Sequence, residues 1–177
     1  MRCKMQVRSI IEGSGYVCTS IDSGEFVLLN ELTESNLSTL TIRLNEEGFF
    51  MLSDYETHVF KTIKGIIAEL VHYSDQVIKV DLDDYLYKKM EIKASELLLL
   101  FSSVKGISIE QYFKLQKIER AKELILYDGL SIDLIVQKLS FGSISEMQHD
   151  FRKLSGLNPD FFENLRIQRL KKIELCE

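Results

Sequence analysis

Hydrophobic positions follow one pattern in the first third of the chain and another in the rest. Up to about residue 52, two stretches with helical spacing alternate with short runs of β-branched and aromatic residues. Thr33 can cap the second helical stretch, and Gly48 ends it. The pattern predicts helices at 5–13 and 34–47 and strands at 16–22, 25–31 and 49–52.

The predicted order of these elements is α-β-β-α-β. That order corresponds to a ferredoxin-like βαββαβ unit whose first strand is missing. We therefore expect an α+β ferredoxin-like domain over residues 1–54, with an open sheet edge where the first strand would lie.

From Asp54 onward, hydrophobic residues keep helical spacing. Ser108 and Gln111 form an S-x-x-Q capping box that opens the longest predicted helix. The predicted helices span 55–73, 83–90, 94–104, 109–127, 131–139, 143–154 and 159–172. We expect a connecting helix and linker at 55–80 and an all-α double helix-turn-helix domain at 81–172, with similar halves around Gly106 and Gly156.

Residues 131–166 have the pattern of a helix-turn-helix, the motif that inserts one helix into the DNA major groove. A short apolar helix leads to a turn that Phe141 fills and Gly142 bends. Ser143 and Glu146 form a second capping box, so the recognition helix should begin near Ile144. The residues of this helix that must face inward are Met147, Phe151 and Leu154.

The outward positions of the recognition helix carry side chains that suit DNA. They are Ser145, Gln148, His149 and Arg152. Glutamine can bond two atoms on the major-groove edge of adenine, and serine is a short donor to a base or a phosphate. Arg152 and Lys153 at the far end are candidates for phosphate contacts, as are Lys138 and Arg166.

Each of these assignments has a simpler alternative. His149, Arg152 and Lys153 could be ordinary solvated surface residues. Glu146 would repel DNA unless it points back at its own helix end, and Asp150 would lower the affinity if it faced the groove.

The charge distribution is unusual for a DNA-binding protein, because the net charge is −5. Residues 1–54 carry 4 basic and 8 acidic side chains, whereas residues 105–177 carry 12 basic and 11 acidic ones. The acidic bias therefore lies in the first domain, and any basic face in the second must come from geometry.

The region from Asp81 to Arg166 resembles the DNA-binding region of the AraC/XylS family of bacterial transcription regulators. The resemblance rests on SF-x-S-x-S followed by FRK-x-x-G-x-x-P, and on a linker helix, YFKLQKIERAKELI. It implies double-stranded DNA as the partner, with a homodimer and an RNA polymerase contact as further partners, and it assigns base and phosphate contacts to the second recognition helix. Two departures from the family are Ser140, where a glycine is usual, and His149, where a basic residue is usual.

The first helix-turn-helix departs further, since Leu98 and Leu99 stand where relatives have a small or polar residue and an arginine. The outer leucines of ELLLLF either contact thymine methyl groups or pack on another surface. We favour packing, because a large apolar patch usually marks an interaction site. Lys93 and Lys105 are the flanking candidates for phosphates.

The first domain resembles the heavy-metal-associated, ferredoxin-like domain of Bacteroidetes-type members of the family. Those domains bind soft metals through C-x-x-C, whereas only the second cysteine, Cys3, is matched here. We therefore expect no metal and no cofactor, and a dimerisation or docking role for this domain.

Other functional classes lack support in the sequence. There is no nucleophile motif, P-loop or dinucleotide-binding turn, so we expect no enzymatic activity. There is no apolar run long enough for a membrane helix, and three widely spaced cysteines favour a reducing cytoplasm. The expected function is sequence-specific regulation of transcription, and the alternative is a regulator-derived protein-interaction module that has lost DNA binding.

Overall fold

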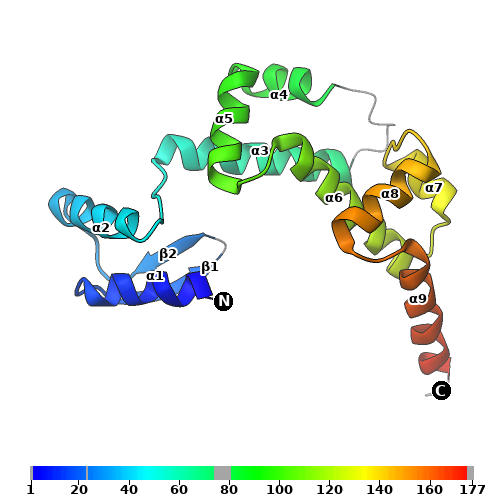
Figure 1. The fold of residues 1–177 in the computed structure, drawn as a ribbon, viewed down its shortest axis with the longest axis horizontal. Helices are drawn as coiled ribbons and strands as arrows, with labels where there is room; N and C mark the ends of the chain where they lie inside the picture. Colours follow the sequence, from blue (N-terminus) through cyan, green and yellow to red (C-terminus); the bar gives the residue numbers. More distant parts are fainter. Residues whose placement is uncertain (1, 23, 74–80, 175–177) are drawn as a thin grey trace. The chain divides into compact units, whose positions relative to one another are not determined.

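The computed structural model describes residues 2–22, 24–73 and 81–174. Its contacts divide the chain into a first unit, Met1–Tyr55, and a second unit, Glu56–Glu177. The part of the predicted linker at 74–80 and the third cysteine, Cys176, lie outside the described residues. Figure 1 shows the ribbon of both units.

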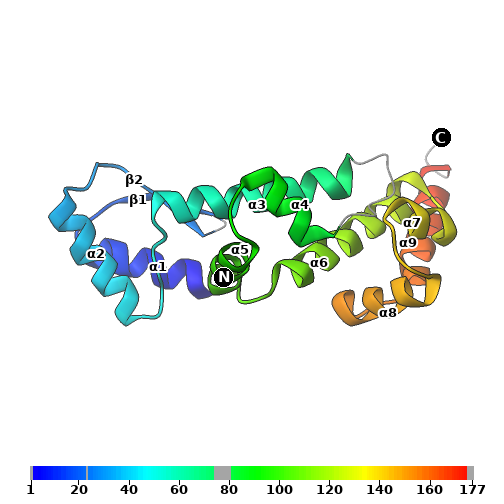
Figure 2. The same cartoon turned by 90° about the horizontal axis from the view of Figure 1, so that it is seen from above.

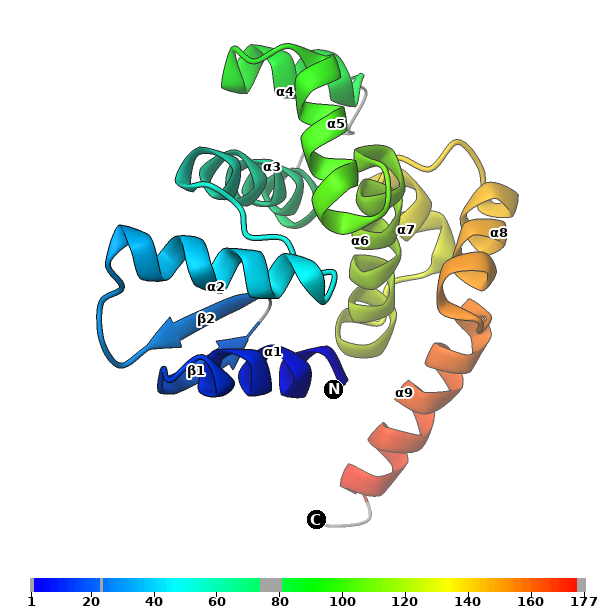
Figure 3. The same ribbon diagram turned by 60° about the vertical axis from the view of Figure 1, so that its left-hand side comes forward.

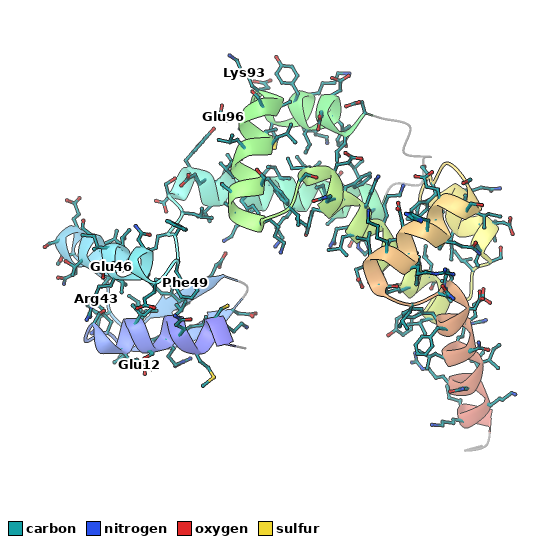
Figure 4. All side chains as sticks on the ribbon, viewed as in Figure 1. Glu12, Arg43, Glu46, Phe49, Lys93 and Glu96 are labelled. Carbon is teal, nitrogen blue, oxygen red and sulfur yellow. The ribbon has the colours of Figure 1, made fainter. Side chains whose placement is uncertain are left out.

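In its described residues, the first unit consists of two helices and a pair of antiparallel strands. Helix α1 (Arg2–Gly13) is followed by strands β1 (Cys18–Asp22) and β2 (Glu25–Leu28) and by α2 (Glu34–Glu46). The strands pair antiparallel, and α1 and α2 run beside them (Figure 3). The small core contains Ile11, Cys18, Leu40 and Leu44. Arg43 on α2 holds the end of α1, because its Nη1 donates to the Gly13 oxygen at 3.0 Å (Figure 4).

The predicted strand at 49–52 is wrong. Strands β1 and β2 make a two-stranded sheet, and the segment after α2 pairs with neither of them. Phe49 instead closes the end of α2 by donating its N–H to the Leu44 oxygen at 2.9 Å, and Phe49 and Met51 pack on the small core. An apolar run needs a neighbouring strand to become a strand, so the described residues show an α-β-β-α order.

All the regular elements in the described residues of the second unit are helices, as its hydrophobic spacing predicts. Its helices are α3 (Asp54–His72), α4 (Leu82–Met90), α5 (Ala94–Lys105), α6 (Ile109–Glu123), a π-helical turn η1 (Leu124–Asp128), α7 (Ile132–Lys138), α8 (Ile144–Ser155) and α9 (Pro159–Glu174). The first two residues of α3, Asp54 and Tyr55, precede the boundary between the units. The predicted capping box at Ser108 and Gln111 is confirmed, with both bonds formed.

One continuous core joins the helices of the second unit. It contains buried residues of α3, α4 and α5 together with others from α6, η1, α7 and α8, and Phe162 of α9 packs against it. Helix α6 links the two halves: α5 precedes it, and α8 lies beside it (Figure 2). Both helix-turn-helix halves are thereby attached to one packed body. None of the helices in the described ranges is long and apolar enough to cross a membrane.

Candidate nucleic-acid interface

The second helix-turn-helix begins each of its two helices with a serine cap. The Ser131 hydroxyl accepts from the Leu134 N–H at 3.5 Å, and the Ser143 hydroxyl accepts from the Glu146 N–H at 3.0 Å. These bonds satisfy N–H groups that a helix start leaves open. Helix α8 therefore starts at Ile144, as the sequence predicts.

Glu146 turns back to its own helix end, although not onto the predicted atom. Its Oε2 accepts from the N–H of Gly142 at 2.9 Å, one residue before the cap. A side chain on Gly142 would place its Cβ 2.6 Å from that oxygen, so the glycine leaves room for the carboxylate. The charge that would repel DNA is thereby bound to the turn.

The turn before α8 is held by a buried lysine of α6. Lys117 is 8% exposed, its Nζ donates to the Ser140 oxygen at 3.0 Å, and it lies 4.0 Å from the centre of the Phe141 ring. Burial lowers the pKa of Lys117 to about 8, while the Glu146 and Asp150 carboxylates act to raise it. Lys117 thus fixes the position of the turn relative to α6.

The inward face of α8 is well defined. Met147 and Phe151 are fully buried, and Leu154 is 37% exposed at the edge of that face. Because successive residues of a helix are rotated by about 100°, the positions opposite this face are those of Ser145, His149 and Arg152. All three side chains are exposed, so the prediction that they face outward is correct.

The two flanks of the outer face differ in charge. Gln148 lies on one flank and is exposed. Glu146, Asp150 and Lys153 share the other flank. Asp150 and Lys153 line a hollow of about 550 Å³ together with Lys114 and Glu110 of α6. Asp150 therefore faces the side of α6 and lies off the outer face.

Arg152 is positioned by the turn that follows α8. Its Nε donates to Oδ1 of Asn158 at 2.8 Å, and Gly156, with a φ of 73°, lets the chain reverse there. The side chain also borders a hollow of about 500 Å³ formed with the start of α9. Its guanidinium is thus held at the far end of the outer face.

The other two predicted phosphate contacts lie on neighbouring helices. Lys138 is exposed in the last turn of α7. Arg166 on α9 is half-buried, and its guanidinium covers Gly129 at the end of η1, where a Cβ would collide with it. Lys138 thus has the exposure that a phosphate contact needs, whereas Arg166 packs in the turn between η1 and α7.

The first helix-turn-helix repeats the second, fifty residues earlier. Leu97 and Phe101 are buried on α5 where Met147 and Phe151 are buried on α8. Gly106 ends α5 in the left-handed conformation of Gly156. The ring centres of Phe101 and Tyr112 are 5.2 Å apart, and those of Phe151 and Phe162, fifty residues later, are 5.4 Å apart. The similar halves expected from the sequence thus share the glycine at the end of the recognition helix and the packing of its inner face.

This repeat identifies the outer face of α5. The positions that correspond to Ser145, His149 and Arg152 are Ser95, Leu99 and Ser102. Of the four consecutive leucines, only Leu99 is exposed, at 76%, because Leu97 is buried and Leu98 and Leu100 pack on the core. The expected apolar patch on this helix is therefore reduced to one side chain.

Sequence reasoning missed the role of Lys117. The signal was its spacing, since Lys117 lies one turn before Ala121 and on the same side of α6 as that buried residue. The backbone of Ser140 is in the αL conformation, with a φ of 52°. The family resemblance gave a signal for this, because it expects a glycine at this position and glycine adopts a positive φ easily.

Comparison with known proteins agrees with the helix-turn-helix geometry described above. Residues 86–165 match the family model described as a helix-turn-helix domain. The chain therefore carries a helix-turn-helix domain over these residues. No curated protein matches this chain.

Two solved structures share the fold of this helix-turn-helix region. The C-terminal domain of the two-component response regulator yesN from Fusobacterium nucleatum is 22% identical, with a TM-score of 0.50 over 60% of this chain and 98% of that one. The C-terminal domain of AraT, a response regulator from Geobacillus stearothermophilus, is 17% identical, with a TM-score of 0.50 over 65% of this chain and 88% of that one.

Within the described residues, no group of three or more histidine, cysteine or acidic side chains is placed to hold a metal.

Proposed function

We propose that this protein regulates transcription by binding double-stranded DNA through the major groove with α8. One observation carries the proposal: the outer face of α8 presents Ser145, His149 and Arg152, while the carboxylates of Glu146 and Asp150 lie on a flank. Negative charge on the outer face would oppose the phosphates, so this arrangement favours approach to DNA.

The side chains of this face have defined tasks in the proposal. Gln148 offers a donor and an acceptor to an adenine edge, and His149 offers a donor to a base acceptor. Ser145 lies near the start of α8, where the helix approaches a base or a phosphate most closely. Arg152 and Lys153 contact phosphates at the other end, and Lys138 does so from α7.

Arg166 has a positioning task in the proposal. Its guanidinium lies over Gly129, so it stabilises the turn between η1 and α7. In this way it positions α7, the first helix of the second helix-turn-helix. A phosphate contact by Arg166 would require DNA to reach that turn.

Duplex DNA from upstream of the protein's own gene tests this proposal. Binding is measured by fluorescence anisotropy over a series of salt concentrations, with scrambled DNA as the control. We expect a preference for the native duplex and an affinity that falls steeply with salt, because each neutralised phosphate releases counterions. Equal affinity for both duplexes, or no binding at low salt, would count against a sequence-specific regulator.

Charge reversal locates the interface. The double variant Arg152→Glu, Lys153→Glu should lose at least about tenfold in affinity and flatten the salt dependence, because two phosphate contacts become repulsive. The matched control is Lys171→Glu, Lys172→Glu, which makes the same change of charge at the exposed far end of α9. If the first variant binds as the wild type does, the docking proposed for α8 is wrong.

The division of labour along the chain is also part of the proposal. We assign DNA binding to residues 81–172, a connecting role to 55–80, and dimerisation or docking to 1–54. The α-β-β-α order of the first unit is compatible with a ferredoxin-like domain that lacks its first strand and in which residues 49–52 form no strand. A dimer would present two copies of α8 to two half-sites, and RNA polymerase is the further partner of such a regulator.

A regulator-derived protein-interaction module remains the second candidate. The observation that favours it is the outer face of α5, where Ser95, Leu99 and Ser102 include no basic group. The same anisotropy experiment separates the two functions, because this candidate predicts no affinity for any duplex even at low salt.

A further inference from the structure

Leu99 is the side chain of the first helix-turn-helix that the proposed DNA-binding function leaves unexplained. It is 76% exposed at the centre of the outer face of α5, fifty residues before His149 on α8. Its neighbours Leu98 and Leu100 pack on the core. A single exposed leucine is too small for a protein-docking patch, so its position on the helix decides how it is interpreted.

The surroundings of Leu99 on this face are small and uncharged. Ser95 and Ser102 lie one turn before and one turn after it. The Ser102 hydroxyl donates to the Leu99 backbone oxygen at 3.0 Å, so its proton is already engaged within the helix. Small residues allow a helix to approach a surface closely, and an isobutyl group projects between them.

The major groove offers one chemical partner for such a group. Its base edges carry hydrogen-bond donors and acceptors, and the apolar exception is the C5 methyl group of thymine. We propose that α5 lies in a major groove and that Leu99 packs against a thymine methyl group. This inference rests on the proposed function, since it requires that the chain bind duplex DNA.

The contact would give the first helix-turn-helix a base preference without adding charge. Lys93 and Lys105, at the two ends of α5, are both exposed and would be its cations toward the phosphates. Specificity from α5 should then depend little on salt, whereas phosphate contacts from either half remain salt-dependent. This division distinguishes apolar base recognition from electrostatic attraction.

Deoxyuridine tests the inference directly, because it differs from thymidine only by the missing methyl group. The 177-residue chain is titrated against a set of duplexes that it binds, in which each thymine is replaced in turn. At one thymine or a neighbouring pair, we expect the wild-type affinity to fall about fourfold, the effect of one buried methyl group. Leu99→Ala should bind the thymine duplex several-fold more weakly and should not respond to deoxyuridine at that position.

The control variant is Leu134→Ala, which truncates an exposed leucine on α7 and should keep the wild-type response to deoxyuridine. A wild-type affinity that no deoxyuridine replacement changes would overturn the inference, as would a Leu99→Ala variant that keeps the wild-type response. Both results leave the proposed function intact. Failure of the wild-type protein to bind any duplex would instead refute the proposed function, and this inference with it.

Discussion

At the scale of one residue, Ser140 strains the backbone, because it stands where the family resemblance expects a glycine. The turn before α8 needs a left-handed backbone, and Ser140 adopts it with a φ of 52°. A side chain at such a φ costs roughly 1–2 kcal/mol relative to glycine. The Ser140 hydroxyl is also buried without a hydrogen-bond partner among the described residues.

Replacing Ser140 by glycine should therefore stabilise the second unit. We expect Ser140→Gly to raise the free energy of unfolding by about 1 kcal/mol, because relief of strain outweighs the added freedom of the unfolded chain. Chemical denaturation measures the change. Ser140→Ala is the control, since it removes the hydroxyl and keeps the strain; a glycine variant no more stable than the alanine variant would contradict this account.

Lys117 predicts a dependence of stability on pH. Its pKa in the folded protein is about 8, below the ordinary value of 10.5, because burial disfavours the charged form. Between these two values the unfolded chain holds a proton that the folded chain has lost, so the stability contributed at this site rises with pH. Below about pH 8 the full cost of burying the charge is present.

Lys117→Met should abolish this rise. Relative to that variant, the wild type should gain about 3 kcal/mol of stability between roughly pH 8 and 10.5, measured by denaturation at several pH values. Other groups titrate in both proteins and cancel in the difference. Lys122→Met, which removes a half-buried lysine of the same helix that does not shift the pKa of Lys117, should retain the wild-type slope. A Lys117→Met variant with the wild-type slope would show that Lys117 is not the group responsible.

At the scale of elements, the two recognition helices end alike and begin differently. Both end at a left-handed glycine, but Ser143 caps α8 whereas Lys93 occupies the cap position of α5. A lysine side chain has no acceptor, so it cannot satisfy the first N–H groups of the helix. Figure 4 shows Lys93 and Glu96 at this start of α5.

A better cap should stabilise α5. We expect Lys93→Ser to raise the free energy of unfolding of the second unit by about 1 kcal/mol, the usual effect of an N-cap hydroxyl. Ser143→Lys, the reciprocal change on α8, should lower it by a similar amount. Thermal unfolding followed by circular dichroism measures both, and a Lys93→Ser variant of unchanged stability would refute the assignment of Lys93 as a defective cap.

Elements whose cause lies in neighbouring residues were predictable from the sequence, and those that depend on distant partners were not. Helical spacing and serine caps placed α7, α8 and α9 to within about two residues. The strand at 49–52 failed because a strand needs a partner that composition does not reveal. Likewise, Leu98 was expected on the outside of α5, and only the packed core shows that it lies inward.

The same distinction holds for the candidate site. The exposure of Ser145, His149 and Arg152 follows from the inward positions of Met147 and Phe151, which the sequence gives. The position of Asp150 depends on where α6 packs beside α8, and no local pattern encodes that. The spacing of Lys117 on α6 indicates that it faces inward, but it does not reveal the bond from Lys117 to Ser140. Sequence could name the outer face of α8 but could not tell which charges lie off it.

At the scale of the whole molecule, the net charge of −5 and a DNA-binding role are compatible because the charge is unevenly distributed. Residues 1–54 carry 4 basic and 8 acidic side chains, so most of the negative excess lies outside the second unit. Within the second unit, Glu146 is bound to Gly142 and Asp150 lies beside α6. The local arrangement on α8, and not the total charge, is what DNA would meet.

The most direct test of the central claim, that α8 recognises bases, measures discrimination between native and scrambled DNA. The double variant Gln148→Ala, His149→Ala should lose about tenfold of the preference for the native duplex, while its affinity for scrambled DNA stays near the wild-type value. Gln137→Ala, at an exposed position of α7, is the control. A double variant with the full wild-type preference would contradict the account, because α8 would then not be the helix that distinguishes one sequence from another.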